Sequence, residues 1–132
     1  MKNKLKSIFA IVILLIVAYS AQAQTKVEWK EMSDFHRVMS QTFHPLEEGN
    51  YLPVRERSGE MVEKAKAWQK ATIPTDYTDV KGIKKNLKLL VRKSSALDKK
   101  IKGNCSDEAI KAELTALHEI FHNIIGLCTD GH

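Results

Sequence analysis

Residues 106–128 read SDEAIKAELTALHEIFHNIIGLC, and this stretch carries the strongest fold signal in the chain. Its apolar residues recur at alternating intervals of three and four, the spacing of one face of an α-helix that packs in a bundle. Ser106 suits an N-cap, and the two acids after it favour the helix dipole. We therefore expect one long amphipathic helix here. Its core stripe is Ile110, Leu114, Leu117, Phe121, Ile124 and Cys128.

Two segments upstream show the same spacing. One follows Pro53, which suits the opening of a helix because its missing N–H is not needed there. The other begins after Asp79 and ends at Gly103-Asn104, a common way to end a helix. The expected core stripes are Val54, Ser58, Met61, Ala65 and Trp68 in the first, and Ile83, Leu87, Leu90, Ser94, Leu97 and Ile101 in the second.

A fourth helix is expected at the beginning of the mature chain, from about Val27 to His44. Pro45 should stop it, because proline disfavours helical geometry in the residue before it. Its expected core stripe is Trp29, Met32, His36, Met39 and Phe43.

No segment alternates with period two, so we expect no strand. Short links between the four helices favour antiparallel neighbours. The predicted fold is therefore all-α, an up-down-up-down antiparallel four-helix bundle.

The first 23 residues have the anatomy of a secretory signal peptide. Lysines at positions 2, 4 and 6 precede an apolar run from Ile8 to Tyr19, and Ala21-Gln22-Ala23 offers a cleavage site. The apolar run is shorter than the roughly 20 residues that span a bilayer. We predict a cleaved signal at 1–23, a bundle domain at 24–132, export to the periplasm, and no membrane span in the mature chain.

The net charge of the mature chain gives no reason to expect a nucleic acid as a partner. The chain carries a formal +5, but three of its lysines lie in the predicted signal, which leaves +2 on the mature part. Lysines cluster from Lys81 to Lys102 among apolar residues at helical spacing, and we expect them to form the solvated face of a helix.

Export would permit a disulfide between Cys105 and Cys128. A continuous helix between them would separate the two thiols by roughly 33 Å, whereas a disulfide needs its Cα atoms within about 7 Å. We expect both cysteines to stay unpaired within the chain, which would still allow a homodimer linked between chains.

Four of the five histidines lie on just two predicted helices, His36 and His44 on the first and His118 and His122 on the last. In an antiparallel bundle of this order the first and last helices are neighbours. His118 and His122 are one turn apart, so both rings project the same way. His36 would occupy a core position, where an imidazole needs a partner.

These histidines predict a transition-metal site. Two imidazoles at that spacing can bind one ion, and His36 from the facing helix would complete a tripod. Met32 or Glu119 could add a fourth ligand, and a thioether would favour copper over zinc. His44, close to Glu47 and Glu48, could hold a second, weaker site.

His118-Glu119-Ile120-Phe121-His122 also matches the zinc-protease pattern H-E-x-x-H, in which the glutamate is a general base. The glycine of the extended motif is misplaced, because it would stand at Ile125 and the chain has Gly126. No nucleophile, phosphate loop or acid pair suggests another reaction, so we expect a protein that is not an enzyme.

The layout resembles that of the periplasmic cytochrome b-562 and cytochrome c-prime superfamily. Glu31-Met32-Ser33 stands early in the first helix and Phe121-His122-Asn123 late in the last, where the b-562 type holds haem. The resemblance implies Met32 and His122 as axial ligands of a non-covalent haem b and a role in electron transfer. Cys128-Thr129-Asp130-Gly131-His132 lacks the second cysteine of C-x-x-C-H, so the covalent haem motif is absent.

Three functions follow from these observations. The first is non-catalytic binding of copper or zinc in the cell envelope, for metal handling or sensing. The alternative is a b-type cytochrome. The third is a structural or partner-binding bundle, with Trp29, Trp68 and Tyr51 marking a contact surface.

Overall fold

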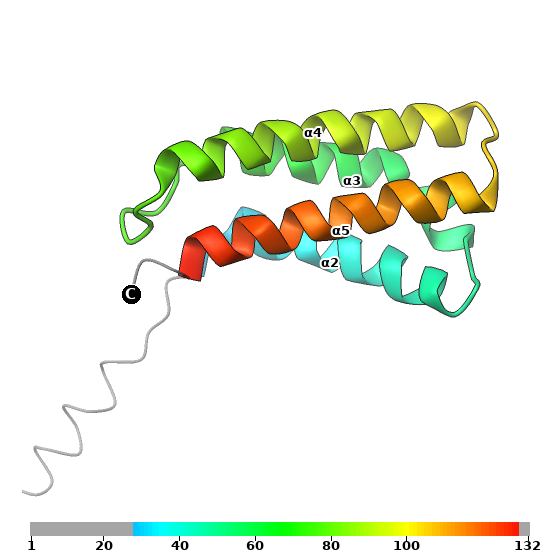
Figure 1. The fold of residues 1–132 in the computed structure, drawn as a ribbon, viewed down its shortest axis with the longest axis horizontal. Coiled ribbons are helices and arrows are strands. Elements are labelled where there is room, and N and C mark those ends of the chain that lie inside the picture. Colours follow the sequence, from blue (N-terminus) through cyan, green and yellow to red (C-terminus); the bar gives the residue numbers. More distant parts are fainter. Residues whose placement is uncertain (1–27, 130–132) are drawn as a thin grey trace, which may run out of the picture.

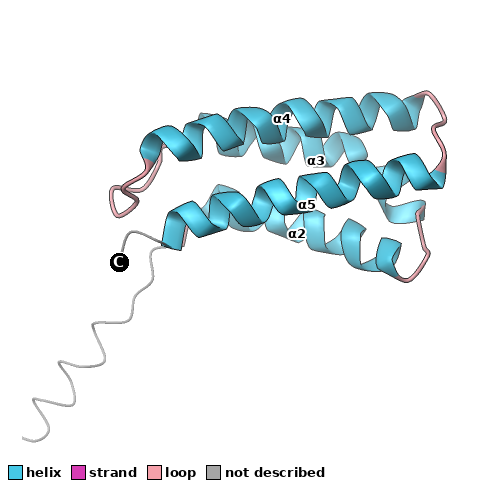
Figure 2. Ribbon diagram, in the orientation of Figure 1, coloured by secondary structure: helices cyan, strands magenta, loops and turns pink. Residues whose placement is uncertain are grey.

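The computed structural model of the protein describes residues 28–129, which form four α-helices joined by short turns (Figure 1). The helices are α2 (Lys30–Glu47), α3 (Leu52–Lys70), α4 (Val80–Lys102) and α5 (Asp107–Thr129). Successive helices pack against each other, and α5 returns to lie beside α2. Figure 2 shows only helices and connecting loops in this part of the chain. The predicted all-α four-helix bundle is confirmed.

Three of the four predicted core stripes are buried without exception. These are the stripes of α3, α4 and α5, to which Ile120 of α5 is added. Since burying a large aliphatic or aromatic side chain contributes about 1.5–3 kcal/mol, these stripes supply most of the force that holds the helices together.

The core face of α2 differs from the prediction. Phe35, Val38 and Thr42 are buried, whereas His36 is exposed. Thr42 is accommodated inside because its hydroxyl donates to the carbonyl of Val38 at 2.9 Å. The expected core position of His36 was therefore wrong. The helix turns its phenyl and valyl side chains to the centre, and His36 lies on the flank that faces α5.

The predicted stop at Pro45 was also wrong, because α2 runs through it to Glu47. Continuing the helix buries Leu46, and proline near the end of a helix removes only one backbone hydrogen bond. The carbonyl of Pro45 accepts from the N–H of Asn50 at 2.9 Å, and Gly49 has a φ of 85°. The turn after α2 thus uses a glycine in the left-handed region, as helix ends often do.

The first helix was predicted to begin at about Val27, whereas α2 begins at Lys30. The predicted start and end of α4 and the predicted start of α5 are confirmed. Asp79 caps α4, since its carboxylate accepts from the N–H of Gly82 at 2.8 Å. The hydroxyl of Ser106 accepts from the N–H of Ala109 at 3.2 Å at the start of α5. Asn104, in the turn between them, has a φ of 57°.

The two tryptophans lie inside the bundle. Trp29 is 3% exposed and Trp68 is fully buried, and their ring centroids are 5.7 Å apart in an edge-to-face arrangement. The proposed contact surface of Trp29, Trp68 and Tyr51 was therefore wrong for both tryptophans. They form core contacts with each other and with Phe35 and Tyr77.

The signal peptide predicted at 1–23 lies outside the described residues. Within residues 28–129, no helix combines the length and the apolar character needed to cross a membrane. Cys105, in the turn before α5, and Cys128, near the end of α5, are both free, as the helix between them predicted.

Candidate metal centre

The seam between α2 and α5 is the least extensive backbone contact among the four pairs of neighbouring helices. The backbones of these two helices stay close over less of their length than those of the other pairs. Aromatic and imidazole rings of the two helices contact each other along this seam. Four histidines and two phenylalanines supply these rings: His36, Phe43 and His44 from α2, and His118, Phe121 and His122 from α5.

Two stacked ring pairs connect α2 and α5. In one pair the imidazole belongs to α5, and in the other it belongs to α2. His118 of α5 stacks on Phe43 of α2, with centroids 4.0 Å apart and planes 5° from parallel. His36 of α2 stacks on Phe121 of α5, with centroids 5.1 Å apart and planes 6° from parallel. Each helix therefore presents one imidazole to a phenyl ring of the other. Such stacks restrict the tilt of the imidazole planes.

His118 and His122 form the closest pair of potential ligands. Their Nε2 atoms are 3.2 Å apart, and their ring centroids are 4.4 Å apart with the planes nearly perpendicular. Without a metal, one Nε2 can donate to the other only if it carries the proton.

The surroundings of His118 favour its neutral form. Burial lowers the pKa of His118 first, and the neighbouring charges of His122, His44 and His36 lower it further, against the opposing effect of Glu47. A neutral imidazole is the form that binds a metal, so little free energy is needed to remove a proton from His118 near neutral pH.

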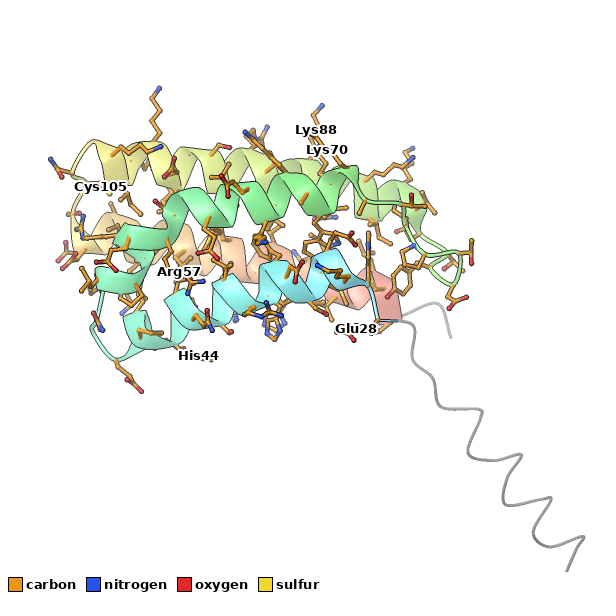
Figure 3. All side chains as sticks on the ribbon, turned by 180° about the vertical axis from the view of Figure 1, so that it is seen from behind. Glu28, His44, Arg57, Lys70, Lys88 and Cys105 are labelled. Carbon is orange, nitrogen blue, oxygen red and sulfur yellow. The ribbon has the colours of Figure 1, made fainter. Side chains whose placement is uncertain are left out.

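The remaining predicted ligands lie around this pair at different positions. His44 is exposed at the last turn of α2, where its Nδ1 lies 3.2 Å from Oε2 of Glu47 (Figure 3). Met32 is half-buried and packs against the core. Glu119 is exposed and lines a surface groove together with Tyr51 and Lys111. Within residues 28–129, no three His, Cys, Asp or Glu side chains are arranged around one point. Of the three histidines predicted to bind one ion, the structure therefore brings His118 and His122 together and leaves His36 apart from them.

Sequence reasoning missed the phenylalanines that orient these histidines. A signal for them was present, because three of the four seam histidines directly follow a phenylalanine, in Phe35-His36, Phe43-His44 and Phe121-His122. In a helix, neighbouring residues point about 100° apart. Each dipeptide can therefore place its phenyl ring toward the interior and its imidazole on the flank.

The arrangement of side chains does not fit a haem between Met32 and His122. The side chain of His122 is exposed. Its Nε2, the atom that would bind iron, lies next to the Nε2 of His118. The interior beside the seam is filled by rings: Phe121 lies 5.9 Å from Phe35 and 6.0 Å from Trp68 between centroids. A haem would have to displace these rings, so haem binding stays a prediction from the resemblance alone.

Comparison with protein-family models, with characterised proteins and with solved structures finds no match for this chain.

Proposed function

We propose that this protein binds one copper or zinc ion through His118 and His122, at the seam of α2 and α5. The observation that carries the proposal is the 3.2 Å separation of the two Nε2 atoms. Two nitrogens bound to zinc at 2.0–2.1 Å with a tetrahedral angle lie about 3.3 Å apart. The separation of the two Nε2 atoms therefore matches that of two nitrogens bound to one ion.

Two further features support the proposal. The stack on Phe43 holds the ring of His118, so less rotational entropy is lost when the metal binds. His44 and His118 both contact the ring of Phe43, and His36 stacks on Phe121, so His36 and His44 are the candidates of α2 for a third ligand. A third ligand from α2 would complete the site.

The biological role that fits such a site is metal handling or sensing in the envelope, without catalysis. Two imidazoles from the protein leave positions on the ion for water or for another ligand. The predicted signal peptide supports a role in the periplasm. An ion held at an exposed seam can be exchanged with a partner more readily than one enclosed in the core.

The test is calorimetric titration of Cu²⁺ and Zn²⁺ into chain 24–132, prepared without a histidine tag and stripped of metal. We expect one ion per chain, and a loss of affinity by orders of magnitude in the double variant His118→Ala/His122→Ala. His132→Ala is the matched control, because it removes an imidazole that the proposal does not use. Unchanged affinity in the double variant would refute the proposal.

The single variants His36→Ala and His44→Ala identify the third ligand. Whichever imidazole joins the ion should weaken binding when it is removed, and the other should not. Circular dichroism of each variant checks that the bundle is intact, which is expected because both side chains are exposed.

A further inference from the structure

The outer face of α4 concentrates the positive charge of the molecule. This helix carries nine basic side chains and one acidic side chain, a net +8. The rest of the described chain, residues 28–79 and 103–129, carries a net −6. The small net charge of the whole protein thus conceals a strong separation between one helix and the other three.

Seven of these nine basic residues form a stripe along the outer side of α4, and Lys93 and Lys100 lie to one side of it. The seven are Lys81, Lys84, Lys85, Lys88, Arg92, Lys99 and Lys102, all exposed. At 100° per residue they fall within about 100° of arc, directly opposite the buried stripe of α4. From the first to the last the stripe is about 32 Å long. Figure 3 shows Lys88 directed away from the bundle, on the side where Lys70 of α3 also lies.

Most of this charge is not neutralised by the protein. Lys102 pairs with Asp98 at 2.6 Å, but the other six residues of the stripe have no ion-pair partner within residues 28–129. Lys85, Lys88 and Arg92 line one shallow groove together with Asn86 and Leu89. Like charges placed this close repel each other, so an anionic surface would stabilise the face.

We propose that α4 docks the protein on an anionic phospholipid surface. The composition of the stripe favours lipid over a protein partner. Protein interfaces are enriched in aromatic residues, Met and Arg and depleted in Lys, whereas α4 has no aromatic residue and its stripe has six lysines to one arginine. Lysine is a compact, hydrated point charge suited to diffuse attraction. A straight stripe on a rigid helix also matches a flat surface.

The docked orientation follows from the order of the helices. Helix α4 contacts α3 and α5 but not α2, so α2 lies diagonally across the bundle from it. A molecule resting on α4 would turn α2, with His36 and His44, away from the lipid. This inference uses none of the seam histidines, and its test is independent of metal binding.

The test is co-sedimentation of chain 24–132 with vesicles of phosphatidylglycerol and phosphatidylcholine, against vesicles of phosphatidylcholine alone. This chain omits the apolar segment Ile8–Tyr19, which would itself enter lipid, and it retains the whole core, formed by residues 29–128. We expect binding to the anionic vesicles only, abolished near 1 M salt, where the Debye length falls to about 3 Å.

Matched charge variants locate the binding face. Each basic residue near an anionic surface raises the affinity about fivefold. The double variant Lys85→Gln/Lys88→Gln should therefore lower the affinity for anionic vesicles about 25-fold. Lys30→Gln/Lys111→Gln removes the same charge from α2 and α5 and should have little effect. Equal loss in both variants, or no binding to anionic vesicles, would overturn the proposal. Equally tight binding to a short DNA duplex at the same salt would overturn the choice of lipid.

Discussion

The imidazole of His118 lies flat against the phenyl ring of Phe43, with centroids 4.0 Å apart and planes 5° from parallel. The two residues come from opposite ends of the described chain, on α5 and α2, and Phe43 is almost fully buried. The stack therefore connects a core side chain to a potential metal ligand.

Shortening Phe43 should affect stability and metal binding together. Phe43→Leu removes the stack and part of the buried surface, and we expect a loss of about 1–2 kcal/mol in the free energy of unfolding. Metal affinity should fall several-fold, because the ring of His118 is no longer held. Urea denaturation and calorimetric titration measure the two effects. Phe35→Leu is the control: it should reduce stability without changing affinity, since Phe35 has no stacked histidine.

Stability should fall as the solution becomes acidic through the titration of His118. Its pKa is lowered in the folded protein, while the unfolded chain titrates near the ordinary value of about 6.5. The unfolded state therefore binds the proton first, and unfolding becomes more favourable as pH falls through about 6.5. The loss levels off once the folded form is protonated too.

Urea denaturation of metal-free protein between about pH 8 and 5 measures this effect. His118→Gln should show a smaller decrease over the same range, because it lacks the titrating group. If wild type and variant lost stability in parallel, the lowered pKa of His118 would not be the cause.

Gly82 and Asp79 should show strong coupling at the start of α4. Asp79→Ala removes the cap and should cost about 1 kcal/mol. Gly82→Ala would normally stabilise a helix by about 1 kcal/mol, but the new Cβ would overlap the Asp79 carboxylate and displace it from the Gly82 N–H. We expect Gly82→Ala to be nearly neutral alone and stabilising in the Asp79→Ala background. A double-mutant cycle in urea tests this, and simple additivity would contradict it.

The two thiols should react at very different rates. Burial raises the pKa of Cys128 to about 11, so its reactive thiolate is scarce at neutral pH. Cys105 is only half-buried. A thiol reagent should therefore modify one cysteine quickly in native protein and the second only after denaturation. Cys105→Ser should abolish the fast phase; a fast phase that survived would show that Cys128 is accessible.

The sequence by itself determined the four helices, the antiparallel order and most of the core. Helical periodicity is a local property, so the stripes of α3, α4 and α5 could be identified from spacing alone. The caps at Asp79 and Ser106 depend on contacts three residues away, which is also local. The convergence of His36, His44, His118 and His122 on one seam followed from the order of the helices.

Only the tertiary structure decided how α2 is rotated and how its ring side chains meet α5. Apolar residues of α2 cover a wide arc, from Met32 through Phe35 to Val38, so several rotations satisfy its periodicity. The positions of α3 and α5 select the one that buries Phe35 and leaves His36 on the flank. The 3.2 Å approach of His118 and His122 likewise depends on side-chain rotations that the Phe43 stack across the seam helps to hold. Packing between helices far apart in the chain sets such details, and no local pattern encodes them.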